Sequence, residues 1–235
     1  MYERSFPLCT ATGTVPALAM ASRSQGPYPG TVLVYHGLRA NKETQRKELE
    51  QLAARGFLAV ALDGVAHGQR AVADLAAHME PDPHARFLGL VAAMLAELPA
   101  VIDALQGLEA IGAVGVAGIS MGGYVAFGAP GADPRVRASV PILGSPDWGE
   151  VPPELVGRIP RQESFAGVGL LAWNAGRDVN VPPHAARSFV RSLPSDYDAE
   201  YVEYPESDHF MRPEDWEDGW ARTLDFLSAR LPTWA

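Results

Sequence analysis

The stretch Ala113-Val-Gly-Val-Ala-Gly-Ile-Ser-Met-Gly-Gly123 decides how the rest of the chain is interpreted. Its first residues are small or β-branched, which is typical of a strand buried in the middle of a parallel sheet. The residues that follow, Gly118-Ile-Ser-Met-Gly122, match the pattern G-x-S-x-G. In this pattern a strand turns sharply into a helix, and glycines stand where side chains would collide. The stretch therefore predicts a strand–turn–helix unit that presents Ser120.

The pattern needs support from its context, because the chain contains 23 glycines and a glycine-rich turn can include a serine by chance. The preceding strand favours the sharp turn, and so does Tyr124-Val-Ala-Phe-Gly-Ala129, which predicts a short buried helix. At the start of that helix, the N–H of Met121 is expected to point to the space where a negatively charged oxygen would form.

Strands and helices alternate along the rest of the chain. The α/β pattern predicts a mostly parallel central sheet with helices on both faces, in a single domain over 1–235. We expect an N-terminal β-hairpin over 2–22 and a small insertion over 144–167. Further strands are predicted at 31–36, 57–63, 136–143, 168–174 and 199–204, and helices at 42–55, 87–108, 183–193 and 213–231. Pro99 should kink the helix 87–108 or begin a new one.

Two polar residues follow the last two predicted strands, Asp178 and His209. Active groups of parallel sheets gather at the carboxyl ends of strands. A serine hydroxyl needs a neighbouring base to become a good nucleophile; histidine suits that role, and a carboxylate orients the histidine. Asp178 could instead cap the helix after Pro182. Asp208 is a competing acid, but it adjoins His209 and reaches the imidazole poorly.

A second backbone donor is expected from Leu38, because Gly37 lets the loop after an earlier strand pass close to the serine. An ordinary His-Gly turn is the alternative. Four residues are candidates for contact with a substrate: Leu38, His67, Trp148 and Phe165. His67 is more simply explained by a His-Gly turn, and the two aromatic residues could equally be buried structural side chains.

Composition narrows the class of protein further. A formal net charge of −9 disfavours binding to nucleic acid or to anionic membranes. We expect no membrane span and no signal peptide, and the single cysteine cannot form an internal disulfide, so a cytoplasmic location is predicted. The sequence has neither metal-ligand spacing nor a nucleotide-binding glycine loop, so no metal or cofactor is expected.

Together these motifs resemble the α/β-hydrolase superfamily. Within it the chain is similar to compact bacterial esterases related to dienelactone hydrolases and to the catalytic domains of prolyl oligopeptidases, over about residues 30–235. The motifs that carry the resemblance are His36-Gly37, Asp63 with His67-Gly68, Gly118 to Gly123, Gly176-Arg-Asp-Val-Asn-Val-Pro182 and Asp208-His-Phe210.

The resemblance implies Ser120 as nucleophile, His209 as base and Asp178 as acid. It also implies an oxyanion hole made by the N–H groups of Leu38 and Met121. The chain has serine where dienelactone hydrolases have a cysteine nucleophile, and it lacks the propeller domain of the oligopeptidases. Both departures favour a small serine carboxylesterase.

The expected function is therefore hydrolysis of small, short-chain carboxylic esters through an acyl-enzyme, without a cofactor, by a monomer or homodimer. A thioesterase or a small-peptide hydrolase would use the same triad. A non-catalytic binding protein on this scaffold is the alternative from another class, and the complete triad argues against it.

Overall fold

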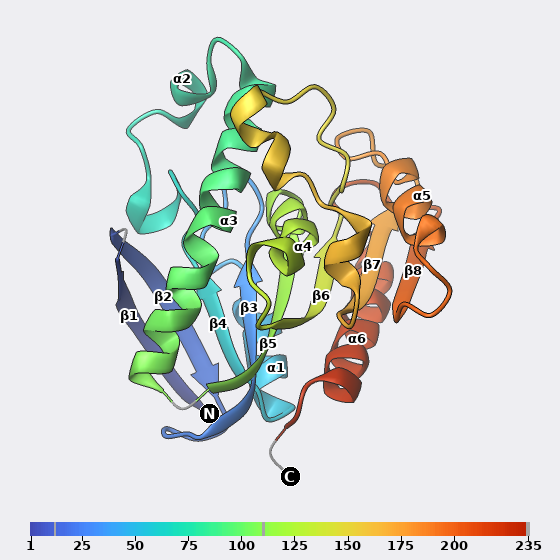
Figure 1. Ribbon diagram of the computed structural model, residues 1–235. Helices are drawn as coiled ribbons and strands as arrows, with labels where there is room; N and C mark the ends of the chain where they lie inside the picture. The colour runs from blue at the N-terminus through green and yellow to red at the C-terminus, as the bar shows by residue number, and fades with distance from the viewer. Residues whose placement is uncertain (12, 110, 234–235) are drawn as a thin grey trace.

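The central feature of the computed structural model is an eight-stranded sheet with the order β1-β2-β4-β3-β5-β6-β7-β8 (Figure 1). The structure describes residues 1–11, 13–109 and 111–233. β1 pairs antiparallel with β2, and β2 antiparallel with β4, whereas the other pairs are parallel. The strands are β1 (Tyr2–Thr10), β2 (Gly13–Ala21), β3 (Tyr28–Tyr35), β4 (Leu58–Leu62), β5 (Ile111–Ile119), β6 (Val136–Ile142), β7 (Gly169–Ala175) and β8 (Ala199–Tyr204).

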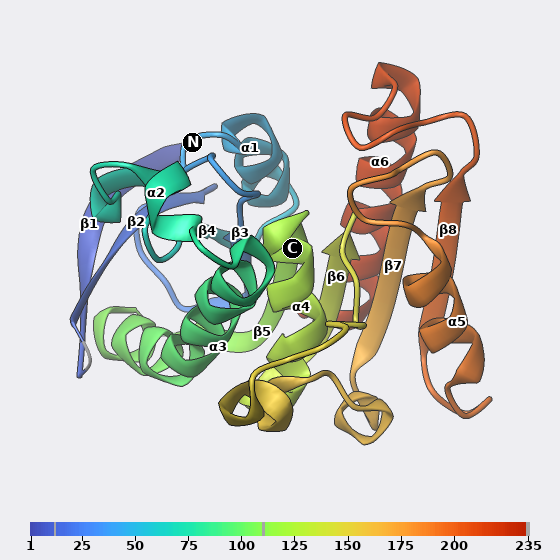
Figure 2. The ribbon, with the colours of Figure 1, turned by 90° about the horizontal axis from the view of Figure 1, so that it is seen from above.

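Helices cover both faces of this sheet. Figure 2 shows α3, α4 and α5 on one face and α1 and α6 on the other. The predicted α/β fold, with its N-terminal hairpin and mostly parallel sheet, is confirmed. The α-helices are α1 (Arg46–Ala54), α2 (Leu75–Met79), α3 (Pro83–Leu108), α4 (Met121–Ala132), α5 (His184–Ser192) and α6 (Pro213–Arg230); the short 3₁₀ helices are η1 (Gly68–Arg70), η2 (Pro153–Arg158) and η3 (Gln162–Phe165).

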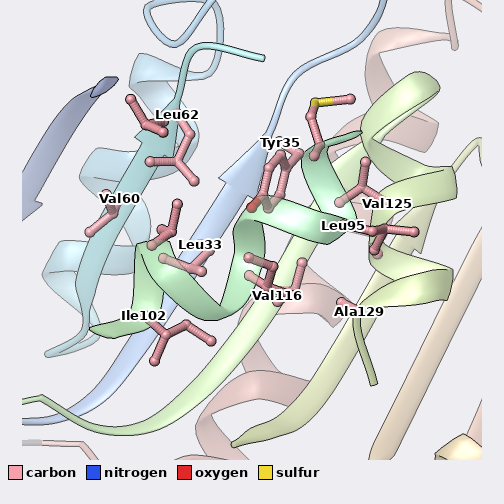
Figure 3. Close-up of a cluster of buried hydrophobic side chains, with 14 of the residues drawn as sticks. Leu33, Tyr35, Val60, Leu62, Leu95, Ile102, Val116, Val125 and Ala129 are labelled. Atoms are coloured by element: carbon pink, nitrogen blue, oxygen red, sulfur yellow. The ribbon is translucent and has the colours of Figure 1, made fainter. Parts of the chain in front are cut away.

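Two apolar layers form the core because the central strands are buried on both faces. Successive side chains of a strand point to opposite faces, so in β3 Leu33 joins the layer under α3 and α4 while Val34 joins the layer under α1 and α6. Figure 3 shows the first layer, in which β3, β4, β5, α3 and α4 contribute Leu33, Tyr35, Val60, Leu62, Leu95, Ile102, Val116, Val125 and Ala129.

Helix α3 differs from its prediction in where it starts. It begins at Pro83 rather than Phe87, because Asp82 caps it by accepting a hydrogen bond of 3.0 Å from the Ala85 N–H. Of the two alternatives at Pro99, the start of a new helix is excluded, because α3 continues through the proline. Buried side chains on both sides of the proline, Leu98 before it and Ile102 after it, hold the helix in the core despite the hydrogen bond that Pro99 cannot donate.

By length and hydropathy alone α3 could cross a bilayer, which the sequence analysis did not expect of any segment. Ten of its residues are buried against the sheet and α4, from Leu88 to Leu105. Packing in the core of this fold therefore accounts for its apolar composition.

The turn between β5 and α4 places Ser120 at backbone angles of φ 55° and ψ −112°, which residues other than glycine rarely adopt. Glycines make the turn possible. A Cβ on Gly118 would lie 2.0 Å from the carbonyl oxygen of Gly122, and one on Gly122 would lie 2.1 Å from that of Tyr35. The Ser120 N–H donates a hydrogen bond of 2.8 Å to the Ile142 carbonyl, which fixes the turn to β6.

We predict that Gly118→Ala costs about 3 kcal/mol or more of unfolding free energy, because backbone atoms cannot move aside for the new methyl group. Gly89→Ala is the matched control, since nothing lies within 4 Å of a Cβ at that helical position. It should stabilise the protein by about 0.5–1 kcal/mol. Urea unfolding of both variants measures the contrast, and equal effects of the two substitutions would contradict this account of the turn.

Candidate active site

Ser120, Asp178 and His209 meet at the carboxyl ends of β5, β7 and β8. The Nε2 atom of His209 lies 3.0 Å from the Ser120 Oγ, and its Nδ1 atom lies 2.7 Å from Asp178 Oδ2. A carboxylate only accepts hydrogen bonds, so Nδ1 carries the proton and Nε2 is left to accept from the serine hydroxyl. The three side chains thus form a continuous hydrogen-bonded series in which the imidazole can take the serine proton.

Asp178 is held by its own turn. Its side chain is fully buried, and Oδ1 accepts hydrogen bonds from the N–H groups of Asn180 at 2.8 Å and Val181 at 2.9 Å. Asp178 does not cap the helix after Pro182, because α5 begins at His184 without a side-chain cap. One carboxylate oxygen organises the turn 178–181, and the other contacts His209. Asp208 is exposed and accepts from the Phe210 N–H at 2.9 Å, within its own loop.

The loop that carries His209 is fixed by a buried serine that the sequence analysis did not single out. The Ser207 hydroxyl donates to Asp215 Oδ2 at 2.7 Å and accepts from the Arg212 N–H at 2.9 Å. These bonds join the loop to the first turn of α6. In the sequence, the position of Ser207 two residues before His209 is only a weak indication of such a role. No sequence pattern predicts its hydrogen bond to Asp215.

The loop after β3 passes beside the serine. A Cβ on Gly37 would lie 3.5 Å from the Ser120 Cβ, so the two backbones are close. Leu38 follows at a half-buried position, and Met121 is the first residue of α4. Within the described part of the chain, neither of their N–H groups donates a hydrogen bond to protein. Both are therefore available as donors to an oxygen bound next to Ser120.

Three of the four candidate substrate contacts lie inside the protein. Trp148 and Phe165 are each 1% exposed, and they pack into the apolar layers, Phe165 with its ring 5.5 Å from that of Phe189. His67 is also buried, with its Nδ1–H donating to the Val65 carbonyl at 2.8 Å. These positions match the structural roles left open for them and give no support to contact with substrate, which leaves Leu38 as the candidate.

Two exposed apolar side chains flank the triad instead. Val179 directly follows Asp178 and Phe210 directly follows His209, and each is 87% exposed. The Phe210 ring stands edge-on to the His209 imidazole, with 6.0 Å between the ring centroids. The His209 side chain itself is 17% exposed. The site is thus open to solvent, with an apolar rim that the sequence analysis did not identify.

His36 connects two loops at the edge of this site. Its Nδ1–H donates to the Gly37 carbonyl at 2.7 Å, and Nε2 accepts from the Gly64 N–H at 2.9 Å. Burial lowers the pKa of His36, and the hydrogen bond to Gly37 offsets this only in part. The imidazole is therefore neutral near pH 7. Among the described residues, no group of three or more His, Cys, Asp or Glu side chains is placed to hold a metal ion.

The lowered pKa of His36 predicts a loss of stability in mild acid. An unfolded chain takes up a proton on this histidine below about pH 6.5, whereas the native state resists it, so unfolding becomes easier as the pH falls. In urea unfolding between pH 7.5 and 5, wild type should lose more stability than His36→Gln. Both proteins share every other side chain, so the difference between their curves reports on position 36. Parallel pH curves for the two proteins would show that His36 is not responsible.

Comparisons with known proteins identify the family of the chain. The sequence matches the family described as "Dienelactone hydrolase family" over residues 15–231. A Bacillus subtilis (strain 168) protein named "Putative esterase YitV" is 28% identical over 216 residues, which cover 78% of this chain and 80% of that protein.

Solved structures share the fold. TT1662 from Thermus thermophilus superposes with a TM-score of 0.76 at 23% identity, covering 98% of this chain and 100% of that one. The PEG-bound structure of a cold-adapted esterase from an Arctic intertidal metagenomic library superposes with a TM-score of 0.75 at 23% identity. The match covers 98% of this chain and 94% of that one. A family match that spans nearly the whole chain, on an α/β-hydrolase fold, establishes that this protein is a hydrolase of the dienelactone hydrolase family.

Proposed function

We propose that the protein hydrolyses small carboxylic esters through an acyl-enzyme formed on Ser120. The observation that carries the proposal is the hydrogen-bonded series from Ser120 through His209 to Asp178, on a turn that holds the serine in a strained conformation. The names of two similar proteins support it, since both YitV and the Arctic protein are called esterases.

In the proposed reaction the Ser120 Oγ attacks the ester carbonyl carbon while His209 Nε2 accepts the hydroxyl proton. The N–H groups of Leu38 and Met121 stabilise the negative charge on the carbonyl oxygen. When the tetrahedral intermediate collapses, His209 returns its proton to the departing alkoxide. Water then attacks the acyl carbon while His209 again accepts a proton, and His209 passes that proton to the Ser120 Oγ as the carboxylic acid leaves. Loss of one oxyanion donor typically costs about 10²–10³ in kcat.

The surroundings of Ser120 favour small acyl groups. The insertion over 144–167 has its helices η2 and η3 packed against α3 and α4. Phe165 is buried within it. Figure 2 shows the helices on this side of the sheet. Among the described residues of the insertion, Val156 is the one large apolar side chain that is strongly exposed, so the insertion supplies little apolar surface to hold a long chain. The exposed rim at Val179 and Phe210 offers contact for a short apolar group only.

Replacement of the serine tests the mechanism directly. A fluorophosphonate should label the wild-type chain with one group per molecule, and Ser120→Ala should abolish labelling and lower p-nitrophenyl acetate hydrolysis at least about 10³-fold. Ser145→Ala, which removes a serine hydroxyl from the insertion, should label like wild type. A wild-type chain that folds but is not labelled would favour a binding protein on a hydrolase scaffold.

Acyl-chain length tests the substrate class. Because little apolar surface surrounds Ser120, we expect kcat/KM for p-nitrophenyl acetate or butyrate to exceed that for the laurate ester about tenfold or more, with assays kept below the concentration at which the long ester aggregates. Matched thioester and anilide substrates, measured in parallel, separate the esterase from a thioesterase or peptidase. A higher kcat/KM on the long-chain ester would exclude the short-chain proposal.

A further inference from the structure

We propose that the buried ion pair between Lys42 and Asp63 is a positioning device for the oxyanion hole: it fixes the loop 37–42, here called the oxyanion loop, and thereby sets the direction of the Leu38 N–H. The inference rests on the proposed function, in which that N–H is an oxyanion donor. Lys42 and Asp63 do not touch the reacting atoms, so their role is to orient rather than to react.

The contacts converge on one carboxylate. Asp63 follows β4, and its side chain is fully buried. Oδ1 accepts from the Lys42 backbone N–H at 2.9 Å, and Oδ2 accepts from the Lys42 ammonium at 3.0 Å and from the Gln69 N–H at 2.9 Å. The carboxylate therefore joins the end of the oxyanion loop to the segment that follows β4, and it holds Lys42 by both its backbone and its side chain.

The other end of the oxyanion loop is joined to the same segment. His36 bonds the Gly37 carbonyl through Nδ1 and accepts from the Gly64 N–H through Nε2. Between the two attachment points the chain turns tightly, with Ala40 N–H donating to the Gly37 carbonyl at 3.2 Å and Arg39 at φ 66°. Leu38 lies inside this turn. With both ends fixed, the direction of its N–H is determined.

The segment after β4 is itself anchored. The Arg70 guanidinium donates to the Asp63 backbone carbonyl at 3.3 Å and forms a two-point ion pair with Glu97 of α3 at 2.5 and 2.9 Å. Gly68 admits the carboxylate, since a Cβ there would lie 2.0 Å from Asp63 Oδ1. The oxyanion loop is thus connected through Asp63 and Arg70 to the long helix of the core.

Stability alone does not account for such a pair. The free energy needed to remove two charges from water is about as large as the free energy gained from their attraction. Replacing a buried ion pair by apolar residues therefore often leaves the stability of a protein unchanged. Burial also raises the pKa of Asp63, but the hydrogen bonds from Gln69 and Lys42 and the nearby ammonium outweigh it and keep the pKa below its usual value. The carboxylate stays charged at neutral pH, so its contacts with Lys42 remain in place throughout the reaction cycle.

The test compares Asp63→Asn and Lys42→Met with Asp133→Asn. Asp133 is a similarly buried carboxylate, paired with Arg135 at 2.6 Å, but it lies past the far end of α4, about 20 Å along the helix from Ser120 at 1.5 Å per residue. For each protein we would measure kcat and KM on p-nitrophenyl acetate, the melting temperature, the final extent of fluorophosphonate labelling and hydrogen exchange of residues 37–42.

Both Asp63→Asn and Lys42→Met should lower kcat about 10- to 100-fold with KM within about threefold, because only the transition state needs the oriented N–H. Residues 37–42 should exchange faster, while labelling still reaches one group per molecule because the triad is untouched. Asp133→Asn should lower the melting temperature about as much as Asp63→Asn and Lys42→Met do, but leave kcat unchanged. Lys42→Met keeps the carboxylate and its backbone hydrogen bonds, so it decides the question if Asp63→Asn does not fold.

Unchanged kcat and unchanged exchange in a folded Lys42→Met protein would overturn the inference while leaving the proposed function intact. A fall in kcat that Asp133→Asn reproduces would also overturn it, since general destabilisation would then be the cause. If wild type is neither labelled nor active, the proposed function itself fails, and the inference fails with it. Labelling of wild type therefore separates the two failures.

Discussion

The close approach of Gly118 to Gly122 is the constraint on which the site depends. Only with no side chain between these backbones can β5 turn directly into α4, and only that turn lifts Ser120 above the sheet at φ 55°. The same geometry makes Met121 the first helical residue, with an N–H that the helix cannot use. One steric condition thus determines the position of the hydroxyl and of one proposed oxyanion donor.

The parallel sheet supplies the other groups. Because parallel strands end at the same edge, Asp178 and His209 follow β7 and β8 toward the side where β5 delivers the serine. Short hydrogen bonds within each loop then fix these side chains. Asp178 accepts the hydrogen bonds of its own turn with one oxygen and contacts the imidazole with the other. One carboxylate therefore both stabilises the turn and orients His209.

Much of this arrangement could be predicted from the sequence, because local patterns encode it. The turn at Ser120 and the polar residues after β7 and β8 are visible in short motifs, and continuous apolar runs predict buried strands. Features set by tertiary contact could not be predicted. The burial of Trp148 and Phe165 depends on how the insertion packs against α3, α4 and α5, and core packing decides between one helix and two at Pro99. The pairing of Lys42 with Asp63 joins two loops that no pattern connects.

The central claim is that Ser120 sits in a preformed site with two backbone donors aimed at one oxygen. A crystal structure of the protein after reaction with a fluorophosphonate tests it most directly. The account predicts phosphorus bonded to the Ser120 Oγ and its phosphoryl oxygen within about 3.1 Å of both the Leu38 and Met121 nitrogens, with the loop 37–42 unmoved. A phosphoryl oxygen directed to solvent, or an adduct on another side chain, would contradict it.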